Sequence, residues 1–184
     1  MAPARCQLYL VAPAELPPDF AETLGGVLEA AEIACLRLPP RLGMEHLVRL
    51  AQGRGTAVVV EADPELAAAL GADGVHLPDL RAYGAARGRL GHDAIIGVSC
   101  DRSRHDAMEA GEAGADYIAF AADLELVRWW AELMLVPVVA ELERLDQAAE
   151  FAAAGAEFIG LGEALWHDPA GAPAAAKRLA AAIG

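Results

Sequence analysis

The sequence predicts an α/β fold, a compact (β/α)8 barrel (TIM barrel) of eight parallel strands with helices outside. Three observations predict it: one phrase is repeated three times along the chain, short β-rich runs are apolar on both faces, and Ala-rich helical segments separate those runs. A chain of 184 residues is about one domain in length. We therefore expect residues 1–184 to form a single barrel domain.

The repeated phrase joins the end of a helix to the start of a strand. Its copies are GADGVHL (71–77), GADYIAF (114–120) and GAEFIGL (155–161). Each copy follows an Ala-rich helical segment, so Gly71, Gly114 and Gly155 are predicted to end helices in the left-handed conformation that glycine tolerates.

The whole chain divides into alternating strands and helices. Strands are predicted to start at residues 7, 33, 56, 74, 95, 117, 136 and 158. Helical patterns fill the gaps at 21–32, 44–53, 64–70, 80–90, 104–113, 124–134, 145–154 and 170–183. The main alternative, an open doubly wound sheet, usually has fewer strands and a glycine-rich first turn, which VAPAELPP lacks.

The net charge and the cysteine content indicate which kinds of binding partner and which cellular compartment are expected. A net charge of −13 argues against nucleic acid and against an anionic membrane surface, because both attract clustered lysine and arginine. Cys6, Cys35 and Cys100 are odd in number and lack C-x-x-C spacing, so neither disulfides nor structural zinc are indicated. With no recognisable leader or membrane span, we expect a cytoplasmic location.

Acidic residues cluster where the predicted strands end, which is where barrel enzymes carry their chemistry. They are Glu61, Asp63, Asp79, Asp101, Asp123, Glu141, Glu143 and Glu163. Their oxygens could converge on magnesium or another hard cation. The alternative, that they cap helices, suits Asp63, Asp101 and Asp123, but it suits Glu61 and Glu141 less well because these continue strand interiors.

Several of these segments resemble one known family over nearly the whole chain. The matching segments are the LYLV opening, LRL, GADGVHL, IIGVSC, GADYIAF, VPVVA and GAEFIGLGEAL. The chain resembles the thiamine phosphate synthase and TenI family of small (β/α)8 barrels. This resemblance implies either a magnesium-dependent synthase, which joins hydroxymethylpyrimidine diphosphate to a thiazole phosphate, or a thiazole tautomerase of the TenI type.

The resemblance implies two catalytic residues, Arg37 and Ser99. Arg37 matches an arginine that follows the second strand's glutamine, and Ser99 of GVSC matches a serine after the fifth strand. Cys35 replaces the glutamine, and Pro39 replaces a lysine two residues beyond the arginine. A loop of threonines and a lysine, or a histidine in TenI, is absent after the sixth strand.

The family's magnesium ligands are also changed. Its Asn-Asp pair after the third strand is Glu61 and Ala62 here, and its second aspartate falls on Arg81, two residues after Asp79. We expect Glu61, Asp63 and Asp79 to replace the missing ligands.

The family holds a phosphate on backbone N–H groups after the seventh and eighth strands. Glu141, Leu142 and Glu143 stand at the first segment, and Glu163 replaces a serine in the second. A carboxylate about 5 Å from a phosphate repels it by roughly 3 kcal/mol at an effective dielectric near 20. A helix N-terminus attracts it by only about 0.3 to 2 kcal/mol, so we expect this phosphate site to be lost.

Other side chains allow more than one interpretation. We place His76 with Glu141, Glu143 and Glu163 among the substrate-binding residues, although a packed barrel histidine is the simpler interpretation. Cys100 could pair with His76 as nucleophile and base, but a packed thiol is more usual. Either Trp129 or Trp130 could face outward and mark a homo-oligomer contact, with helix packing as the alternative.

Two functional hypotheses follow. The first is a divergent, catalytically degenerate family member that has lost its diphosphate and phosphate apparatus and binds a small heterocycle or a partner. The alternative is an active thiamine phosphate synthase with magnesium. The missing loop, Pro39, Ala62 and the two glutamates Glu141 and Glu143 lead us to expect the first.

Overall fold

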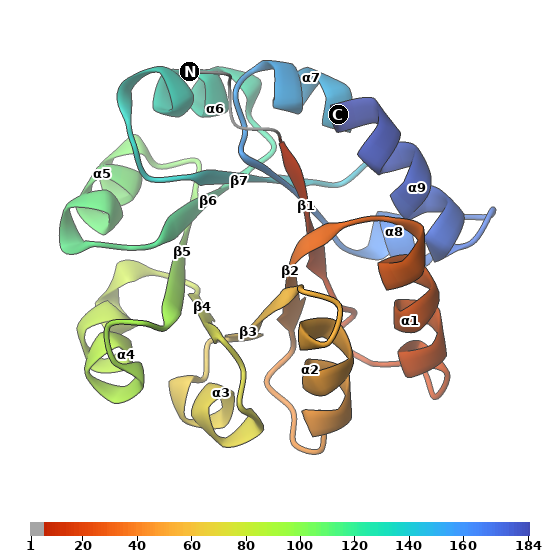
Figure 1. Cartoon of the computed structure of the whole chain (residues 1–184). Coiled ribbons are helices and arrows are strands. Elements are labelled where there is room, and N and C mark those ends of the chain that lie inside the picture. Colours follow the sequence, from red (N-terminus) through yellow and green to blue (C-terminus); the bar gives the residue numbers. More distant parts are fainter. Residues whose placement is uncertain (1–5) are drawn as a thin grey trace.

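The computed structural model describes residues 6–184, which form a closed barrel of eight strands (Figure 1). Each strand pairs in parallel with the next, and the eighth pairs with the first. The strands are β1 (Gln7–Val11), β2 (Ile33–Leu38), β3 (Ala57–Glu61), β4 (Gly74–Leu77), β5 (Ile95–Asp101), β6 (Tyr117–Ala121), β7 (Val138–Leu142) and β8 (Phe158–Leu161). The predicted (β/α)8 barrel is confirmed.

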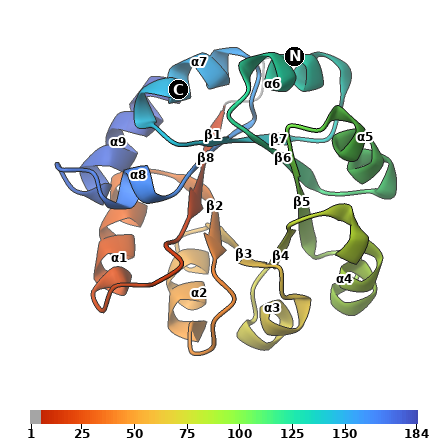
Figure 2. The same ribbon diagram turned by 180° about the vertical axis from the view of Figure 1, so that it is seen from behind.

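Helices surround the barrel on its outside, as the two opposite views show (Figures 1 and 2). They are α1 (Phe20–Ala30), α2 (Glu45–Gln52), α3 (Pro64–Leu70), α4 (Tyr83–Leu90), α5 (Arg104–Ala113), α6 (Leu124–Leu133), α7 (Ala148–Ala153), α8 (Glu163–Trp166) and α9 (Ala172–Ile183), with 3-10 turns η1 (Leu80–Ala82) and η2 (Leu145–Gln147). The short α8 was not predicted. Within residues 6–184, no helix has the length and apolar character needed to cross a bilayer.

Local sequence signals set most element boundaries. Gly71, Gly114 and Gly155 have φ angles of 69°, 93° and 104°, which confirms the predicted left-handed helix ends. The strand predicted to start at residue 136 starts at Val138 instead. Pro137 has no N–H for the ladder, and the carbonyl of Val136 accepts a hydrogen bond from the Trp130 indole at 2.7 Å.

Two apolar layers follow from the alternation of side chains along each strand. One set of side chains points outward and packs against the helices in a large core, with a separate small cluster of Val75, Leu77, Ile96 and Ala86 beside α4. The other set points into the barrel and forms a smaller cluster of Tyr9, Cys35, Val59, Tyr117, Ala119 and Val139. The interior is therefore filled by side chains, and only its mouth is available for chemistry.

A hydrogen-bonded chain of polar side chains crosses this interior. The Tyr117 hydroxyl lies 2.8 Å from the Tyr9 hydroxyl and 3.0 Å from Nδ1 of His76. Space for the Tyr117 ring comes from Gly97 on the neighbouring strand, because a Cβ there would lie 1.9 Å from the ring. Burial, reinforced by the charge of Arg37, holds the pKa of His76 well below its usual value, so the imidazole is neutral.

Replacing Gly97 by alanine tests the packing of the barrel interior. The added methyl group would collide with Tyr117, so we expect the free energy of unfolding to fall by about 1–3 kcal/mol. The matched control is Gly88→Ala on α4, where a Cβ would have nothing within 4 Å. That change should raise stability by about 0.5–1 kcal/mol. Urea unfolding measures both, and equal stability of the two variants would contradict this packing.

The buried neutral histidine predicts a loss of stability in mild acid. Below pH 6.5 the unfolded chain protonates His76 while the folded chain does not, so protonation favours unfolding. Between pH 7.5 and pH 5.5 this costs about 1.4 kcal/mol. His76→Asn should lose that part of the pH dependence in urea unfolding, with the exposed His92→Asn as the matched control. Parallel pH profiles for wild type and His76→Asn would contradict the prediction.

Candidate active site at the barrel mouth

Polar side chains from five strands meet at the C-terminal mouth of the barrel. They are Arg37 of β2, Glu61 of β3, His76 of β4, Ser99 of β5 and Glu141 of β7. By the alternation along each strand, all of them point toward the inside of the barrel. Arg37, Glu61 and Glu141 each follow an interior residue of the same strand by two positions. His76 and Ser99 pair in the strand register with Glu61 and Ala119. The structure therefore places five of the residues predicted from the sequence at this end of the barrel, and it brings Arg37 and Glu141 into direct contact.

An ion pair between Arg37 and Glu141 crosses the mouth. Nη1 of Arg37 lies 2.7 Å from Oε1 of Glu141, and the two side chains are only 11% and 30% exposed. Burial alone would lower the pKa of the guanidinium, but Tyr9, Glu141 and Glu61 together raise it. Arg37 thus stays charged. Its Nε is buried and has no hydrogen-bond partner among the described residues.

Glu61 differs from Glu141 because its carboxylate is uncommitted. It is half-buried, and it makes no hydrogen bond or ion pair with any side chain in the described part of the chain. The next residue, Ala62, has a φ of 57°, a conformation that non-glycine residues rarely adopt. Its N–H donates to the carbonyl of His76 at 2.8 Å, which holds the end of β3 against β4.

The other two predicted metal ligands have structural partners. Oδ1 of Asp63 caps α3 by accepting a hydrogen bond from the Leu66 N–H at 2.9 Å. Asp79 accepts a hydrogen bond from the backbone of Arg81 and forms an ion pair with its side chain, and these contacts lower the pKa of Asp79. Asp63 therefore caps a helix, which was the alternative to metal binding that the sequence suggested for it.

Magnesium commonly binds through one or two carboxylates together with substrate phosphates and waters. Glu61, Asp63 and Asp79 do not form a group whose oxygens all lie within 4.8 Å of one another. Within residues 6–184, that criterion is met by His105, Asp106 and Glu109, which are exposed on α5. The free oxygens of Glu61 suit a hard cation whose coordination is completed by water or by substrate. Magnesium binding by these carboxylates stays a prediction.

Ser99 lies at the edge of a cavity of about 420 Å³ between the loops that follow β4 and β5. Asp79 and Arg81 line the same cavity, together with Asp101, whose φ is 46°. A bulge in the pairing of β5 with β6 lies between Ser99 and Asp101. The predicted pair Ser99 and Asp79 thus shares one cavity, separate from the Arg37–Glu141 ion pair.

The three glutamates predicted to repel a phosphate do not converge. Glu141 points inward onto Arg37, whereas Glu143 is exposed. Glu163 is exposed at the start of α8, where Oε2 lies 2.8 Å from Nδ1 of His167. Glu141 and Glu163 are paired and Glu143 faces solvent, so the three carboxylates are not unpaired neighbours of one phosphate site.

Two further sequence hypotheses concern Cys100 and the adjacent tryptophans, and the homo-oligomer contact suggested for the outward tryptophan stays a prediction. Cys100 packs in the outer core, whereas His76 lies inside the barrel, so they do not form a nucleophile and base pair. Burial also raises the pKa of Cys100 to about 12. Trp130 is buried and Trp129 is only partly so, with Arg104 stacked 4.6 Å above its ring, as their adjacent helix positions predicted.

Sequence reasoning missed Tyr9 and Tyr117 as parts of the site's floor. Both tyrosines occupy positions in predicted strands that face the inside of the barrel, where a buried hydroxyl group needs a hydrogen-bond partner. This pattern could have identified them. No local pattern could have revealed the contact of Arg37 with Glu141, because the two residues are 104 positions apart.

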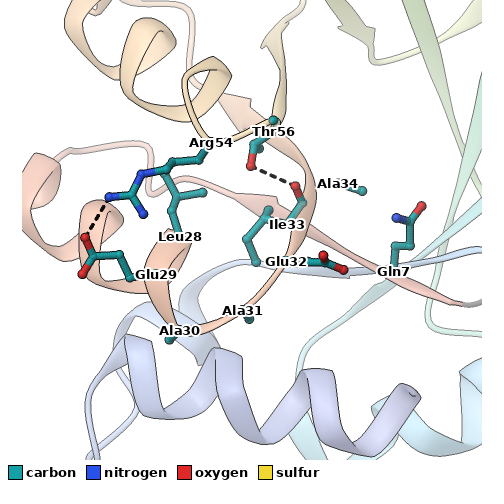
Figure 3. A pocket seen from close by; sticks show the side chains of 11 residues that line it. Gln7, Leu28, Glu29, Ala30, Ala31, Glu32, Ile33, Ala34, Arg54 and Thr56 are labelled. Carbon is teal, nitrogen blue, oxygen red and sulfur yellow. Dashed lines mark hydrogen bonds and ion pairs between the residues drawn. The ribbon is translucent and has the colours of Figure 1, made fainter.

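A second cavity, of about 550 Å³, opens at the opposite end of the barrel (Figure 3). It lies beside the N-terminal ends of β1 and β2, with an ion pair of 2.8 Å between Arg54 and Glu29 at its edge. The Thr56 hydroxyl donates to the carbonyl of Ile33 in its wall. Chemistry in parallel barrels sits at the other end, so we do not assign this cavity to the active site.

Solved structures share this architecture. The structure of thiamine phosphate pyrophosphorylase from Pyrococcus furiosus superimposes with a TM-score of 0.84, covers 98% of this chain and 96% of that one, and is 23% identical. Orotidine 5′-phosphate decarboxylase from Pyrococcus horikoshii superimposes with a TM-score of 0.75 at 17% identity, covering 95% of this chain and 98% of that one. At these identities the likeness shows the fold alone.

Sequence comparison is more specific. Thiamine-phosphate synthase of Rhodospirillum centenum is 40% identical over 195 aligned residues, 93% of this chain and 94% of that protein. The enzymes so named in Hyphomonas neptunium and Erythrobacter litoralis are 37% and 36% identical, over 95% and 96% of this chain and 91% and 96% of those proteins. Each alignment is longer than the 184 residues of this chain, so each relative has residues that this chain lacks.

These relatives overturn the expectation of a catalytically degenerate protein, since chains this similar over nearly their full length are named as synthases. The expectation rested on substitutions in loops and on repulsion by carboxylates that the structure shows paired or turned outward. The family described as Thiamine monophosphate synthase matches residues 41–165. The chain belongs to the thiamine monophosphate synthase family.

Proposed function

We propose that this protein is an active thiamine-phosphate synthase, a transferase that joins hydroxymethylpyrimidine diphosphate to a thiazole phosphate with loss of pyrophosphate. Relatives of that name, 36–40% identical over nearly the whole chain, support the assignment. The single structural observation that carries it is Arg37, a buried and charged guanidinium with an unpartnered Nε at the mouth of the barrel.

Arg37 is the anion-binding group in this proposal. A diphosphate needs donors in a site from which water is largely excluded, and a guanidinium offers several N–H groups in a fixed plane. One of these, Nη1, is committed to Glu141. Nη2 makes no hydrogen bond within residues 6–184, so its N–H groups can donate to phosphate oxygens, whereas Nε is buried.

Glu61 and Asp79 are the carboxylates that we assign to magnesium, with Asp63 contributing only the oxygen not used in capping α3. Magnesium held by these carboxylates would neutralise negative charge on the leaving diphosphate. Cation binding here would also reconcile an acidic mouth with an anionic substrate, because the carboxylates would attract the metal that the substrate carries.

The proposal assigns Ser99 and His76 to the remaining walls of the site. Ser99 is half-buried at the rim and can donate its hydroxyl to a phosphate oxygen. His76 forms part of the floor as a neutral imidazole, fixed through Nδ1 by Tyr117. A neutral floor suits an uncharged pyrimidine ring.

The short connection after β6 fits the same assignment. Only Ala122 and Asp123 separate β6 from α6, so no long loop can supply further cationic residues at that position. The charge of the diphosphate would therefore be met by Arg37 and the metal. Activity should depend strongly on both.

Turnover of the purified chain with both substrates and magnesium tests the proposal. We expect wild type to form thiamine phosphate and a chelator to abolish the reaction. Arg37→Ala should lower kcat/KM about 100-fold or more, the usual scale for losing a donor to developing negative charge. The matched control is Arg128→Ala, which removes an exposed arginine on α6. Absence of product with wild type, or full activity of Arg37→Ala, would contradict the proposal.

A further inference from the structure

The Arg37 side chain does not pair with the acidic residue on its neighbouring strand. Glu61 lies on β3, which is hydrogen-bonded to β2, two residues beyond Val59, the residue that pairs with Arg37 in the strand register. The ion pair is instead made with Glu141 of β7, which β1 and β8 separate from β2 in the closed barrel (Figures 1 and 2). Two carboxylates thus compete for one guanidinium, and Glu141, which lies on the strand farther away in the sheet, forms the ion pair.

We infer that Glu141 is a positioning residue that holds Arg37 on the β7 side of the mouth and thereby leaves the Glu61 carboxylate free to bind a divalent cation. The inference rests on the proposed function, because that function needs a free arginine for the anionic substrate and a free carboxylate for the metal at the same barrel mouth. Glu141 touches neither of them in this role and acts through Arg37.

Three observations carry the argument. The Arg37–Glu141 contact is short and largely buried, so it restrains the guanidinium more than an exposed ion pair would. Glu61 has no hydrogen-bond or ion-pair partner within residues 6–184, although it lies two residues beyond the register partner of Arg37. Nε of Arg37 is also left without a partner, which shows that Glu141 engages only part of the guanidinium.

Loss of the Glu141 charge should therefore move Arg37 toward Glu61. An ion pair between them would neutralise Glu61 and compete directly with a metal for its oxygens. A divalent cation would then bind more weakly although every one of its proposed ligands is still present. Removing Arg37 as well should restore binding, because no cationic side chain would remain to occupy Glu61.

Binding of Mn²⁺ alone, followed by the electron paramagnetic resonance signal of the free ion, measures this without substrate or turnover. Glu141→Ala should weaken Mn²⁺ binding about 10- to 100-fold, the usual scale for losing a residue that orients a metal ligand. Glu61→Gln should weaken it at least as much. The double variant Arg37→Ala/Glu141→Ala should bind Mn²⁺ at least as tightly as wild type.

Glu125→Ala is the matched control, because Glu125 is an exposed glutamate on α6 that lies outside the ion pair. Far-ultraviolet circular dichroism verifies that each variant is folded, and Glu141→Gln, which keeps the shape of the side chain, replaces Glu141→Ala if that variant unfolds. Wild-type affinity in the folded Glu141 variant would overturn the inference. Weak binding that persists in the double variant would also overturn it, because Glu141 would then be a metal ligand itself.

The same titration separates the inference from the proposed function. If wild type makes no thiamine phosphate but the Mn²⁺ affinities change as expected, only the proposed function fails. If turnover is observed while wild type shows no Mn²⁺ binding or the Glu141 variant binds normally, only the role of Glu141 fails.

Discussion

The guanidinium of Arg37 and the carboxylate of Glu141 meet 2.7 Å apart over the interior of the barrel, and the charge balance of the mouth depends on this contact. Without a partner, a buried guanidinium would carry a large desolvation cost, and so would the half-buried carboxylate. Paired, they leave the mouth with one restrained cationic group and one free carboxylate, Glu61. A cationic group beside a free carboxylate suits an anionic substrate that binds together with a metal ion.

The barrel supports this arrangement from below. Gly97 makes room for Tyr117, whose hydroxyl connects Tyr9 to His76 and fills the interior with satisfied polar groups. His76 stays neutral because it is buried and because Arg37 lies near it. The floor thus adds no charge of its own, and the electrostatics of the site are decided by Arg37 and the glutamates at the rim.

The carboxylates that follow the strand ends do not act together on one site. Repulsion of a phosphate would require several of them to be unpaired and to face the same position. Glu141 lies within β7 and points inward, whereas β7 ends at Leu142 and the following Glu143 is exposed to solvent. Glu163 begins a separate short helix. A count of charges near strand ends therefore overstated the negative potential that a bound phosphate would meet.

The sequence by itself determined the barrel, because its signals are local: glycines that end helices in the left-handed conformation, short apolar strands, and a phrase repeated three times. It also marked Arg37, Glu61, His76, Ser99 and Glu141 as mouth residues, since parallel strands all end at one face. Tertiary structure alone decided which of them pair. Arg37 and Glu141 are 104 residues apart and lie on strands that are not neighbours, so only closure of the barrel brings their charges together.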